Sequence, residues 1–393
     1  MALNALERKS VAALAAIYAT RMLGLFLLLP VLALYARKLP DYSPALLGLT
    51  MGAYGLAQVL LQIPFGRWSD RRGRKPLITL GLLVYAAGSL LGAMAHSLVA
   101  LLAARAVQGA GAVSAPVMAL LADLTRTQVR TRAMAFIGIS IGLSFVAALV
   151  LAPALDSVIG VRGIFVVMLV MALVGILLLH LAVPAEPLRS AASAPSRHEN
   201  LLGVLRQRPL RPLYFGVFVL HFLMTAMFLA VPQVLVGHLG IAAEHHWAVY
   251  LGVFVASLAG TVPLILGTER GHFDRSAFVL SVGLLAVSQT LLALGQGHRW
   301  AVLAALAVFF AAFNYLEARL PSLLTTAASA QDRGAALGMF ATCQFLGAFA
   351  GGALGGLLLG RYGLSGVFWG AAVLALVWSI AASLQVAPRR TAR

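Results

Sequence analysis

The amino-acid sequence predicts an all-α integral membrane protein whose twelve transmembrane helices form two pseudo-symmetric six-helix bundles. Of the 393 residues, 61% are hydrophobic and only 10% are charged, and the mean hydropathy is +0.94. A soluble domain carries about 25% charged residues because water must wet its surface, so lipid must surround most of this chain. The apolar residues form twelve blocks, each long enough for a bilayer-spanning helix of roughly 20 residues.

The first apolar block is expected to remain in the protein as a transmembrane helix. It is too long for a cleaved signal peptide, and no small-residue cleavage site follows it. The twelve helices are expected to lie within residues 11–36, 43–66, 76–95, 98–121, 133–155, 161–183, 212–236, 246–267, 276–296, 300–324, 334–358 and 362–384.

The basic balance of the chain, with a formal net charge of +17, is explained by membrane topology. If the N-terminus is cytoplasmic, the inner loops and tails hold 21 of the 29 Lys and Arg residues, the outer loops hold five, and three lie within the spans. Positive side chains accumulate on the cytoplasmic side of membrane proteins, so we expect both termini in the cytoplasm. The basic loops are also expected to attract anionic membrane lipids, and nucleic-acid binding is not needed to explain the charge.

A long inner segment containing P-A-E-P and A-A-S-A-P-S separates the sixth expected helix from the seventh. Weak internal similarity supports two related halves, because R-A-M-A-F-I-G at Arg132 resembles R-G-A-A-L-G at Arg333. Pro116 and Pro321 lie late in the two fourth helices, and the offsets of the two pairs are 201 and 205 residues. Two bundles with a binding site between them at mid-membrane are a known plan of membrane transporters. The predicted N-terminal bundle, cytoplasmic linker and C-terminal bundle comprise residues 1–185, 186–211 and 212–393.

Two sequence motifs resemble signatures of the major facilitator superfamily. The segment from Gly66 to Pro76 reads G-R-W-S-D-R-R-G-R-K-P and is similar to the pattern G-x-x-x-D-R-x-G-R-[KR]. The fourth helix reads L-L-A-A-R-A-V-Q-G-A-G and resembles the second signature at Arg105, Gln108 and Gly109. R-M-L-G-L-F-L-L-L-P and F-N-Y-L-E-A-R-L-P-S-L resemble the bacterial YajR-type subfamily, which is grouped with drug:proton antiporters. The resemblance covers essentially the whole chain and implies the major facilitator fold in a bacterial inner membrane.

The sequence departs from that subfamily in two places. It ends soon after the twelfth expected helix, so we expect no small soluble C-terminal domain. The fifth-helix antiporter signature, G-P-x-x-G-G in full, is present only as A-P-A-L-D-S around Pro153. This motif therefore gives weak support for antiport.

The first motif is expected to form a cytoplasmic gate. Asp70, Arg74 and Asp123 lie at the expected cytoplasmic ends of helices 2, 3 and 4, where an ionic cluster would latch the three helices together. The resemblance implies that this latch also meets helix 11, whose N-terminus near Asp332 and Arg333 carries a partial positive dipole. A basic loop anchored at the lipid surface is the alternative. The predicted gate residues are Gly66, Asp70, Arg71, Gly73, Arg74 and Asp123; the glycines are expected to allow tight packing or turns.

Glu317 is the first candidate for a proton carrier. The chain has twelve acidic residues, and Glu317 alone lies well inside an expected helix. A charged carboxylate is costly in the membrane, so this group should tend to hold a proton. Asn314 precedes it by three residues and shares its helical face. The alternative is a carboxylate tied structurally to an arginine or an amide.

Three further ionisable residues are candidates for proton coupling. His221 lies deep in helix 7 and belongs to the one side-chain type whose ordinary pKa is near physiological pH, although such a histidine is more often a hydrogen-bonded core residue. Arg21, deep in helix 1, is expected to face protein or a cavity, where it could bind an anionic substrate, tune Glu317 or lock helix packing. Arg105 resembles the family's fourth-helix arginine, which the resemblance implicates in proton transfer.

A polar stripe on helix 2 predicts one wall of a substrate cavity, because Tyr54 and Gln58 recur four residues apart. Amides elsewhere in the spans and adaptable methionine and phenylalanine side chains suit an amphipathic organic solute. Ordinary helix packing is an equally good explanation for any one of the apolar residues. The predicted cavity residues are Tyr54, Gln58, Gln108, Met224, Phe228, Asn314 and Gln344.

Several chemistries have no sequence motif here. No G-x-x-x-x-G-K-[ST] loop for ATP, no H-E-x-x-H and no G-x-S-x-G is present, so we expect neither an enzyme nor a cofactor. Adjacent His245 and His246 do not make a helical metal site, and Cys343 is the only cysteine. We expect a monomeric, proton-coupled exporter of small amphipathic organic solutes that works by alternating access. A metabolite symporter or uniporter and a lipid or lysolipid flippase are the alternatives.

Overall fold

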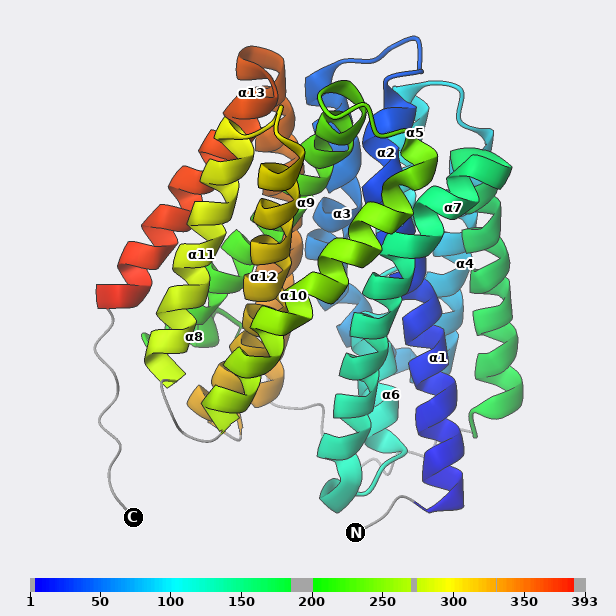
Figure 1. Ribbon diagram of the computed structural model, residues 1–393. Helices are drawn as coiled ribbons and strands as arrows, with labels where there is room; N and C mark the ends of the chain where they lie inside the picture. Colours follow the sequence, from blue (N-terminus) through cyan, green and yellow to red (C-terminus); the bar gives the residue numbers. More distant parts are fainter. Residues whose placement is uncertain (1–3, 185–200, 270–273, 330, 385–393) are drawn as a thin grey trace.

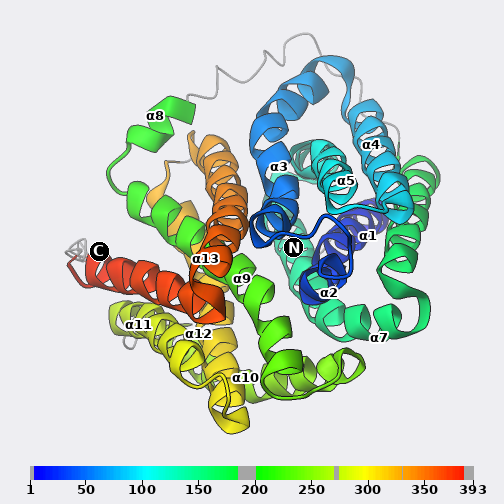
Figure 2. The same ribbon diagram turned by 90° about the horizontal axis from the view of Figure 1, so that it is seen from above.

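The computed structural model describes residues 4–184, 201–269, 274–329 and 331–384. These residues form helices joined by short turns, and they contain no strand. The helices form two groups that lie side by side, one built from α1–α7 and the other from α9–α13 (Figures 1 and 2). The start of α1 lies at the bottom of Figure 1, and the last part of α13 runs down toward the same side. We call this side the terminal end and the opposite side the far end.

The first bundle begins with well-capped helices. Asn4 and Glu7 form a capping box at the start of α1, and Ser43 and Ser97 cap α3 and α5 through their hydroxyls. Such caps satisfy backbone N–H groups that a helix leaves without partners. The helices are α1 (Ala5–Leu27), α2 (Leu29–Ala36), α3 (Pro44–Arg72), α4 (Arg74–Met94), α5 (Leu98–Ala110), α6 (Ser114–Asp123) and α7 (Thr127–Ala182).

The second bundle follows a short helix and contains the most deeply buried span. Helix α9 lies at the centre of the molecule, and 89% of its most apolar stretch is buried. The elements are α8 (Leu201–Arg206), α9 (Arg211–Gly237), η1 (Ala243–His245), α10 (His246–Glu269), α11 (Asp274–Leu294), α12 (Arg299–Ala327) and α13 (Arg333–Leu384). The predicted linker at 186–211 lies largely outside the described residues; in its described part, Leu201–Arg206 forms α8 and Arg211 begins α9.

The described chain crosses the membrane twelve times, as the sequence predicted. It contains ten helical segments that are long and apolar enough to span a bilayer. Two of these segments, α7 and α13, each contain two consecutive spans. The spans are separated by Gly160 in α7 and by Gly363 in α13, and each glycine has a φ of +68°. Residues with a side chain rarely adopt that φ, so glycine permits both turns. The two glycines are 203 residues apart, between the offsets of 201 and 205 seen in the sequence.

Several expected boundaries were wrong, because two of the expected helices break shortly before a proline and a third helix continues past its expected end. The first span breaks at Leu28 and the fourth at residues 111–113, where each was expected to be one helix. Pro30 and Pro116 follow these breaks; a proline ring clashes with the carbonyl four residues earlier. Gly111 is the residue at which α5 ends. Helix α3 also continues to Arg72, which places most of the first motif on a helix and not in a loop.

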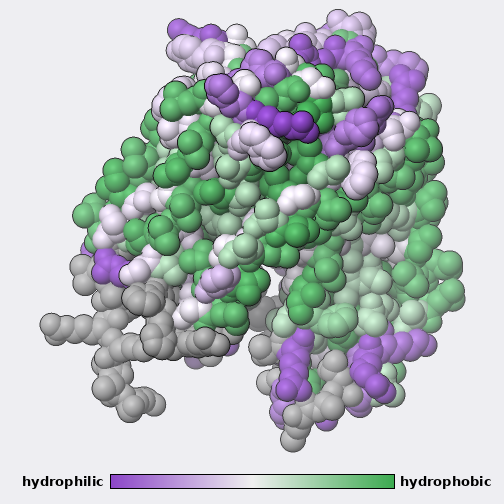
Figure 3. Space-filling model, in the orientation of Figure 1, coloured by the Kyte–Doolittle hydropathy of each residue, from purple (hydrophilic) through white to green (hydrophobic). Residues whose placement is uncertain are grey.

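Large apolar side chains cover the outside of both bundles (Figure 3). Leu143, Val158 and Leu181 are more than 60% exposed, and many other leucines and valines share this orientation. A soluble protein rarely exposes so large a contiguous apolar surface, whereas a membrane protein presents it to lipid. The polar residues are concentrated toward the upper and lower ends in Figure 3, which is the pattern expected of a spanning protein.

The two bundles meet closely at the far end. There α3 packs against α13, α2 against α9, and α7 against α10. The contact between α3 and α13 is a backbone contact through glycines, because a Cβ on Gly48 would collide with the Gly352 carbonyl. At the terminal end the surface is notched between the bundles (Figure 3). The fold is therefore closed at the far end and parted at the terminal end.

Candidate functional site

The second bundle brings together three polar side chains predicted from the sequence. His221 on α9 lies with its Nε2 atom 3.8 Å from Oε2 of Glu317 on α12. The same Nε2 atom is 2.7 Å from the amide nitrogen of Gln344 on α13. His221 is buried, whereas 40% of the Glu317 side chain is exposed. The carboxylate is thus reachable by water, and the imidazole lies behind it.

The hydrogen bonds of His221 fix the role of each ring nitrogen. Its Nδ1 atom lies 3.1 Å from the carbonyl oxygen of Val217, and a carbonyl can only accept, so Nδ1 carries a hydrogen. In the neutral ring Nε2 then accepts a hydrogen bond from Gln344. A proton that arrives at Nε2 makes an imidazolium beside the Glu317 carboxylate. The arrangement can therefore hold one proton on either of two neighbouring groups.

The first bundle contains a second polar cluster centred on Arg21. This guanidinium donates to Oγ of Ser114 over 2.8 Å and to the hydroxyl of Tyr54 over 2.6 Å. Gln58 donates to the Tyr54 hydroxyl over 3.3 Å and to the Gly109 carbonyl over 2.8 Å. Arg21 and Tyr54 are almost fully buried. The predicted polar stripe of α3 therefore faces α1 and α5 and does not line an open cavity.

Arg105 lies over the ring of the same tyrosine. Its guanidinium carbon is 5.0 Å from the centre of the Tyr54 ring, and that of Arg21 is 5.8 Å away. Arg105 donates to Gln108 over 2.9 Å, and Gln108 donates to Ser89 over 2.9 Å. In the part of the chain that the structure describes, no carboxylate forms an ion pair with Arg21 or Arg105.

The two clusters occupy equivalent places in the two halves. Arg21 and His221 lie 200 residues apart, and Ser114 and Glu317 lie 203 residues apart, which matches the offset of the repeat. Each pair joins the first helix of its half to the fourth. Ser114 was not predicted from the sequence, because a serine in an apolar span usually forms a hydrogen bond with the backbone of its own helix. Its position beside the break before Pro116 is the signal that was available.

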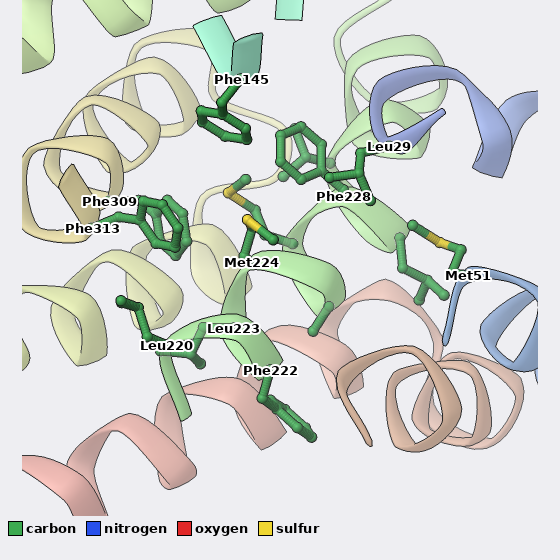
Figure 4. Packing of buried hydrophobic residues seen from close by; sticks show 14 of the residues in the cluster. Leu29, Met51, Phe145, Leu220, Phe222, Leu223, Met224, Phe228, Phe309 and Phe313 are labelled. Carbon is green, nitrogen blue, oxygen red and sulfur yellow. The ribbon is translucent and has the colours of Figure 1, made fainter. Parts of the chain in front are cut away.

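The predicted apolar cavity residues belong to a packed aromatic layer between the bundles (Figure 4). Phe145 of α7 contacts Phe228 of α9 and Phe313 of α12, with ring centres 6.4 and 6.1 Å apart. Met224 lies beside these rings and is buried. Phe228 is fully buried, so neither residue lines an open cavity in this conformation. Asn314 is half-buried, one turn before Glu317.

A ring contact links the two polar clusters across the interface. Tyr54 of the first bundle lies 6.3 Å from Phe345 of α13, measured between ring centres. Phe345 directly follows Gln344, the partner of His221. The structure therefore divides the predicted polar residues between two clusters and does not place them in one common cavity. The aromatic layer and the Tyr54–Phe345 contact lie between the two clusters.

The predicted gate residues gather at the terminal end of the first bundle. Arg74 contacts Asp70 over 2.5 Å and Asp123 over 3.5 Å, and it donates to Ser69 over 2.6 Å. Arg71 is exposed beside this cluster. Gly73 joins α3 to α4 with a φ of +95°, a turn conformation that favours glycine. Gly66 does not need to be small for close packing, since a Cβ there would meet only Ala115 at an ordinary 3.5 Å.

The expected contact of this cluster with the eleventh span, which is the first part of α13, is not made through Asp332. Asp332 accepts hydrogen bonds from Gln207 over 3.0 Å and from Ser329 over 2.9 Å, both within the second half. The side chains of Asp70 and Asp123 are 40% and 36% exposed. These positions fit a structure whose bundles are parted at the terminal end.

A pocket of about 500 Å³ lies at the far end, between the two bundles. Arg37 donates to Gln233 across it over 3.3 Å and so ties α2 to α9. Tyr42, His238 and Tyr362 complete much of its lining. Among the described residues, no group of three or more His, Cys, Asp and Glu side chains could hold a metal ion.

Comparison with known proteins agrees with the fold and the motifs. The chain matches the Major Facilitator Superfamily over residues 14–270. It is 41% identical over 387 residues to the Inner membrane transport protein YajR of Escherichia coli (strain K12), which covers 97% of this chain and 84% of that protein. It is also 25% identical to Multidrug resistance protein 2 of Bacillus subtilis (strain 168) over 86% of this chain and 85% of the relative.

Among solved structures, a bacterial homolog of the human lysosomal transporter Spinster, in an inward-facing and occupied conformation, superposes with a TM-score of 0.77. The alignment covers 98% of this chain and 97% of that one, and the sequences are 15% identical, so the likeness concerns the fold. The match of most of the chain, the identity to a relative along nearly its full length and the twelve-span fold agree. This chain is a membrane transporter of the major facilitator superfamily.

Proposed function

We propose that this transporter is a proton-coupled exporter of small amphipathic organic solutes and that the pair His221–Glu317 carries the proton. The observation on which the proposal rests is the 3.8 Å separation of these groups inside the helical bundle. Intramembrane ionisable residues are expensive and commonly mark ion pathways. Here one member is buried and the other is partly exposed, as a group that exchanges protons with water requires.

The pair changes its charge when it exchanges a proton. With the proton bound, the two groups are together neutral, as imidazolium with carboxylate or as imidazole with carboxylic acid. Without the proton, one negative charge remains inside the membrane. Since an uncompensated charge there is unfavourable, gain or loss of the proton can bias the two facing states of the transporter.

Proton and solute can alternate by competing for the same space. A solute that fills the cleft between the bundles removes water from the exposed side of Glu317, so proton exchange requires the cleft to be empty. Alternation of this kind gives antiport and export. A relative named Multidrug resistance protein 2 is in keeping with export. A symporter would instead bind proton and solute together, and a uniporter would need no proton.

The proposal also includes a cellular location. We place the chain in the bacterial inner membrane with both termini in the cytoplasm, because the basic residues are concentrated in the loops on the terminal side. A relative named as an inner membrane transport protein supports this location. The parted end of the structure would then face the cytoplasm, where a solute for export is loaded.

The test uses inside-out vesicles with an acidified lumen and a lumenal pH dye. A panel of aromatic dyes of positive, neutral and negative charge is added outside, with a fluorescent lysolipid as a separate arm. Solute-dependent proton release from the lumen in the wild type, but not in Glu317→Gln, supports the proposal. Solute uptake without proton movement would show uniport, and movement of the lysolipid alone would show a flippase.

A further inference from the structure

The first bundle holds two positive charges for which the described structure supplies no negative partner. Arg21 is 3% exposed and Arg105 is 1% exposed, and no carboxylate within the described ranges pairs with either. Buried charges are strongly unfavourable unless they are paired and hydrogen-bonded. The hydroxyls of Tyr54 and Ser114 and the face of the tyrosine ring solvate these cations, but they do not neutralise them.

Hydrogen-bonding capacity also remains unused at this place. The Nε atoms of both arginines and the Oε1 atom of Gln58 are buried without a hydrogen-bond partner. Each Nε–H is a donor, so two donors in addition to the charges await an acceptor. An oxyanion group satisfies both needs, because arginine binds carboxylates, sulfonates and phosphates through two parallel N–H bonds.

Comparison of the two repeats shows that the first bundle lacks a carboxylate that the second bundle has. In the second bundle, the cationic candidate His221 faces the carboxylate of Glu317. At the equivalent place of the first bundle, Arg21 faces the hydroxyl of Ser114. The first half therefore has the cation but not the acid of this pair. A charge supplied from outside the chain can take the position that Glu317 occupies in the other half.

We infer that Arg21 and Arg105 bind the acidic group of the transported solute, which is an organic anion with an aromatic or alkyl body. Tyr54 contacts Arg21 through its hydroxyl and Arg105 through its ring, and the same ring lies next to Phe345 of α13. A shift of the bundles that removes this contact gives the solute access to the arginines. The acidic group then replaces the Tyr54 and Ser114 hydroxyls on Arg21, and the apolar body lies against the phenylalanines of the interface.

This inference rests on the proposed transport function, whose substrate class it names, but it is independent of the direction of proton coupling. Export of such a solute is favoured by the membrane potential, because an interior-negative cell repels anions. Ligand binding to the purified chain requires no gradient. Binding can therefore fail while coupled transport persists, or persist while coupling fails, and the two claims are distinguishable.

The experiment measures the unfolding temperature of the purified full chain in detergent at fixed ionic strength. The probes are 1-naphthalenesulfonate, the neutral 1-naphthalenemethanol, the cationic 1-naphthylmethylammonium and inorganic sulfate. We expect saturable stabilisation by the sulfonate and at least tenfold weaker apparent affinity in Arg21→Gln and Arg105→Gln. Arg162→Gln, which changes an exposed arginine at the far end, is the matched control and should bind like the wild type.

Ser114→Asp keeps the test decisive if the arginine variants fold poorly. It supplies the carboxylate that the other half has, so it should remove sulfonate stabilisation while the unfolding temperature without probe stays equal or rises. Equal stabilisation by the neutral or cationic probe, or unchanged sulfonate binding in all three variants, would overturn the inference. Sulfate binding as strong as that of the sulfonate would show a site for a small inorganic anion and would likewise overturn the assignment of the substrate.

Discussion

The Nε2 atom of His221 lies 3.8 Å from the Oε2 atom of Glu317, so two ionisable side chains from different helices lie next to each other. Gln344 donates to the same nitrogen over 2.7 Å, and the Val217 carbonyl occupies the other ring nitrogen. The two groups were separate candidates in the sequence. Their contact means that a change in either one alters the environment of the other.

The first prediction concerns Glu317→Gln. The amide keeps the shape and some hydrogen bonding of the protonated acid, but it cannot release a proton. The variant should therefore exchange solute across the membrane at a rate close to that of the wild type and lose accumulation driven by a pH gradient. Solute counterflow and gradient-driven transport, measured in the same proteoliposomes, separate these two activities.

Asn314→Ala and His221→Gln are the companion variants. Asn314→Ala removes an amide one turn from Glu317, so it should alter solute affinity and leave coupling intact. His221→Gln keeps a hydrogen-bonding side chain but removes the titrating ring, so it should retain transport with a changed pH profile. Gradient-driven accumulation by Glu317→Gln at the wild-type rate would exclude Glu317 as the carrier and leave His221 as the remaining candidate of the pair.

The second prediction concerns the ionic cluster at the terminal end. Asp70→Asn removes one negative charge from the neighbours of Arg74, whose pairing must change when that end closes. A change of a few kcal/mol is sufficient to shift such a two-state equilibrium. Transport should fall at least tenfold, with expression and unfolding temperature near those of the wild type, and the balance of facing states should change.

Arg72→Gln is the control for this variant, because Arg72 is an exposed residue of the same motif. It should transport like the wild type. Labelling of single cysteines placed at the two ends reports the facing states. Wild-type transport and labelling in Asp70→Asn would show that the motif acts as a topogenic basic segment and not as a gate.

The third prediction uses Asp41, which lies in the loop after α2. Its carboxylate accepts hydrogen bonds from the backbone N–H groups of Leu98 over 2.6 Å and Val99 over 2.9 Å. These bonds favour the charged form and hold the pKa of Asp41 below its usual value. A pKa that is lower in the folded state than in the unfolded state stabilises the fold when the carboxylate is charged. This stabilisation is present above the pKa of the unfolded state, near 3.9, and is lost as the pH falls through the pKa of the folded state.

Asp41→Asn should therefore unfold at a lower temperature than the wild type at pH 7. The difference should begin to shrink as the pH falls below about 4, where the carboxylate of the unfolded wild type takes up a proton, and it should continue to shrink until the folded carboxylate is protonated too. Unfolding scans of both proteins between pH 7 and pH 3 test this. A difference that stays constant across the range would show that the charge of Asp41 does not contribute.

The fold was largely predictable from the sequence, whereas the site was predictable only in part. Hydropathy alone gives twelve spans, because lipid selects apolar residues over the length of each helix. The breaks before Pro30 and Pro116 were missed, although proline is a local signal. The contacts His221–Glu317 and Arg21–Ser114 depend on how distant helices pack, and no local pattern encodes that. The burial of Tyr54 and Phe228 also depends on the conformation.

The last prediction concerns the glycine contact that closes the far end. A Cβ on Gly352 would lie against the Gly48 carbonyl and 2.9 Å from the Gly52 nitrogen, too close for either backbone to remain in place. Overpacking of this kind costs about 1–3 kcal/mol, and the cost applies only while the far end is closed. Gly352→Ala should therefore shift the transporter toward opening at the far end and slow transport. The measurement is labelling of Tyr42→Cys, a residue of the far-end pocket, with a membrane-impermeant maleimide in a Cys343→Ala background.

Gly338→Ala is the matched control on the same helix, because a Cβ there meets no atom within 4 Å. It should label and transport like the wild type, which separates the effect of the contact from the effect of alanine on helix α13. Gly48→Ala, made on the opposing helix, should reproduce the Gly352→Ala phenotype, since a Cβ there would collide with the Gly352 carbonyl across the same contact. Equal labelling of Tyr42→Cys in the Gly352→Ala and Gly338→Ala proteins would mean that the far end does not close through this glycine contact during transport.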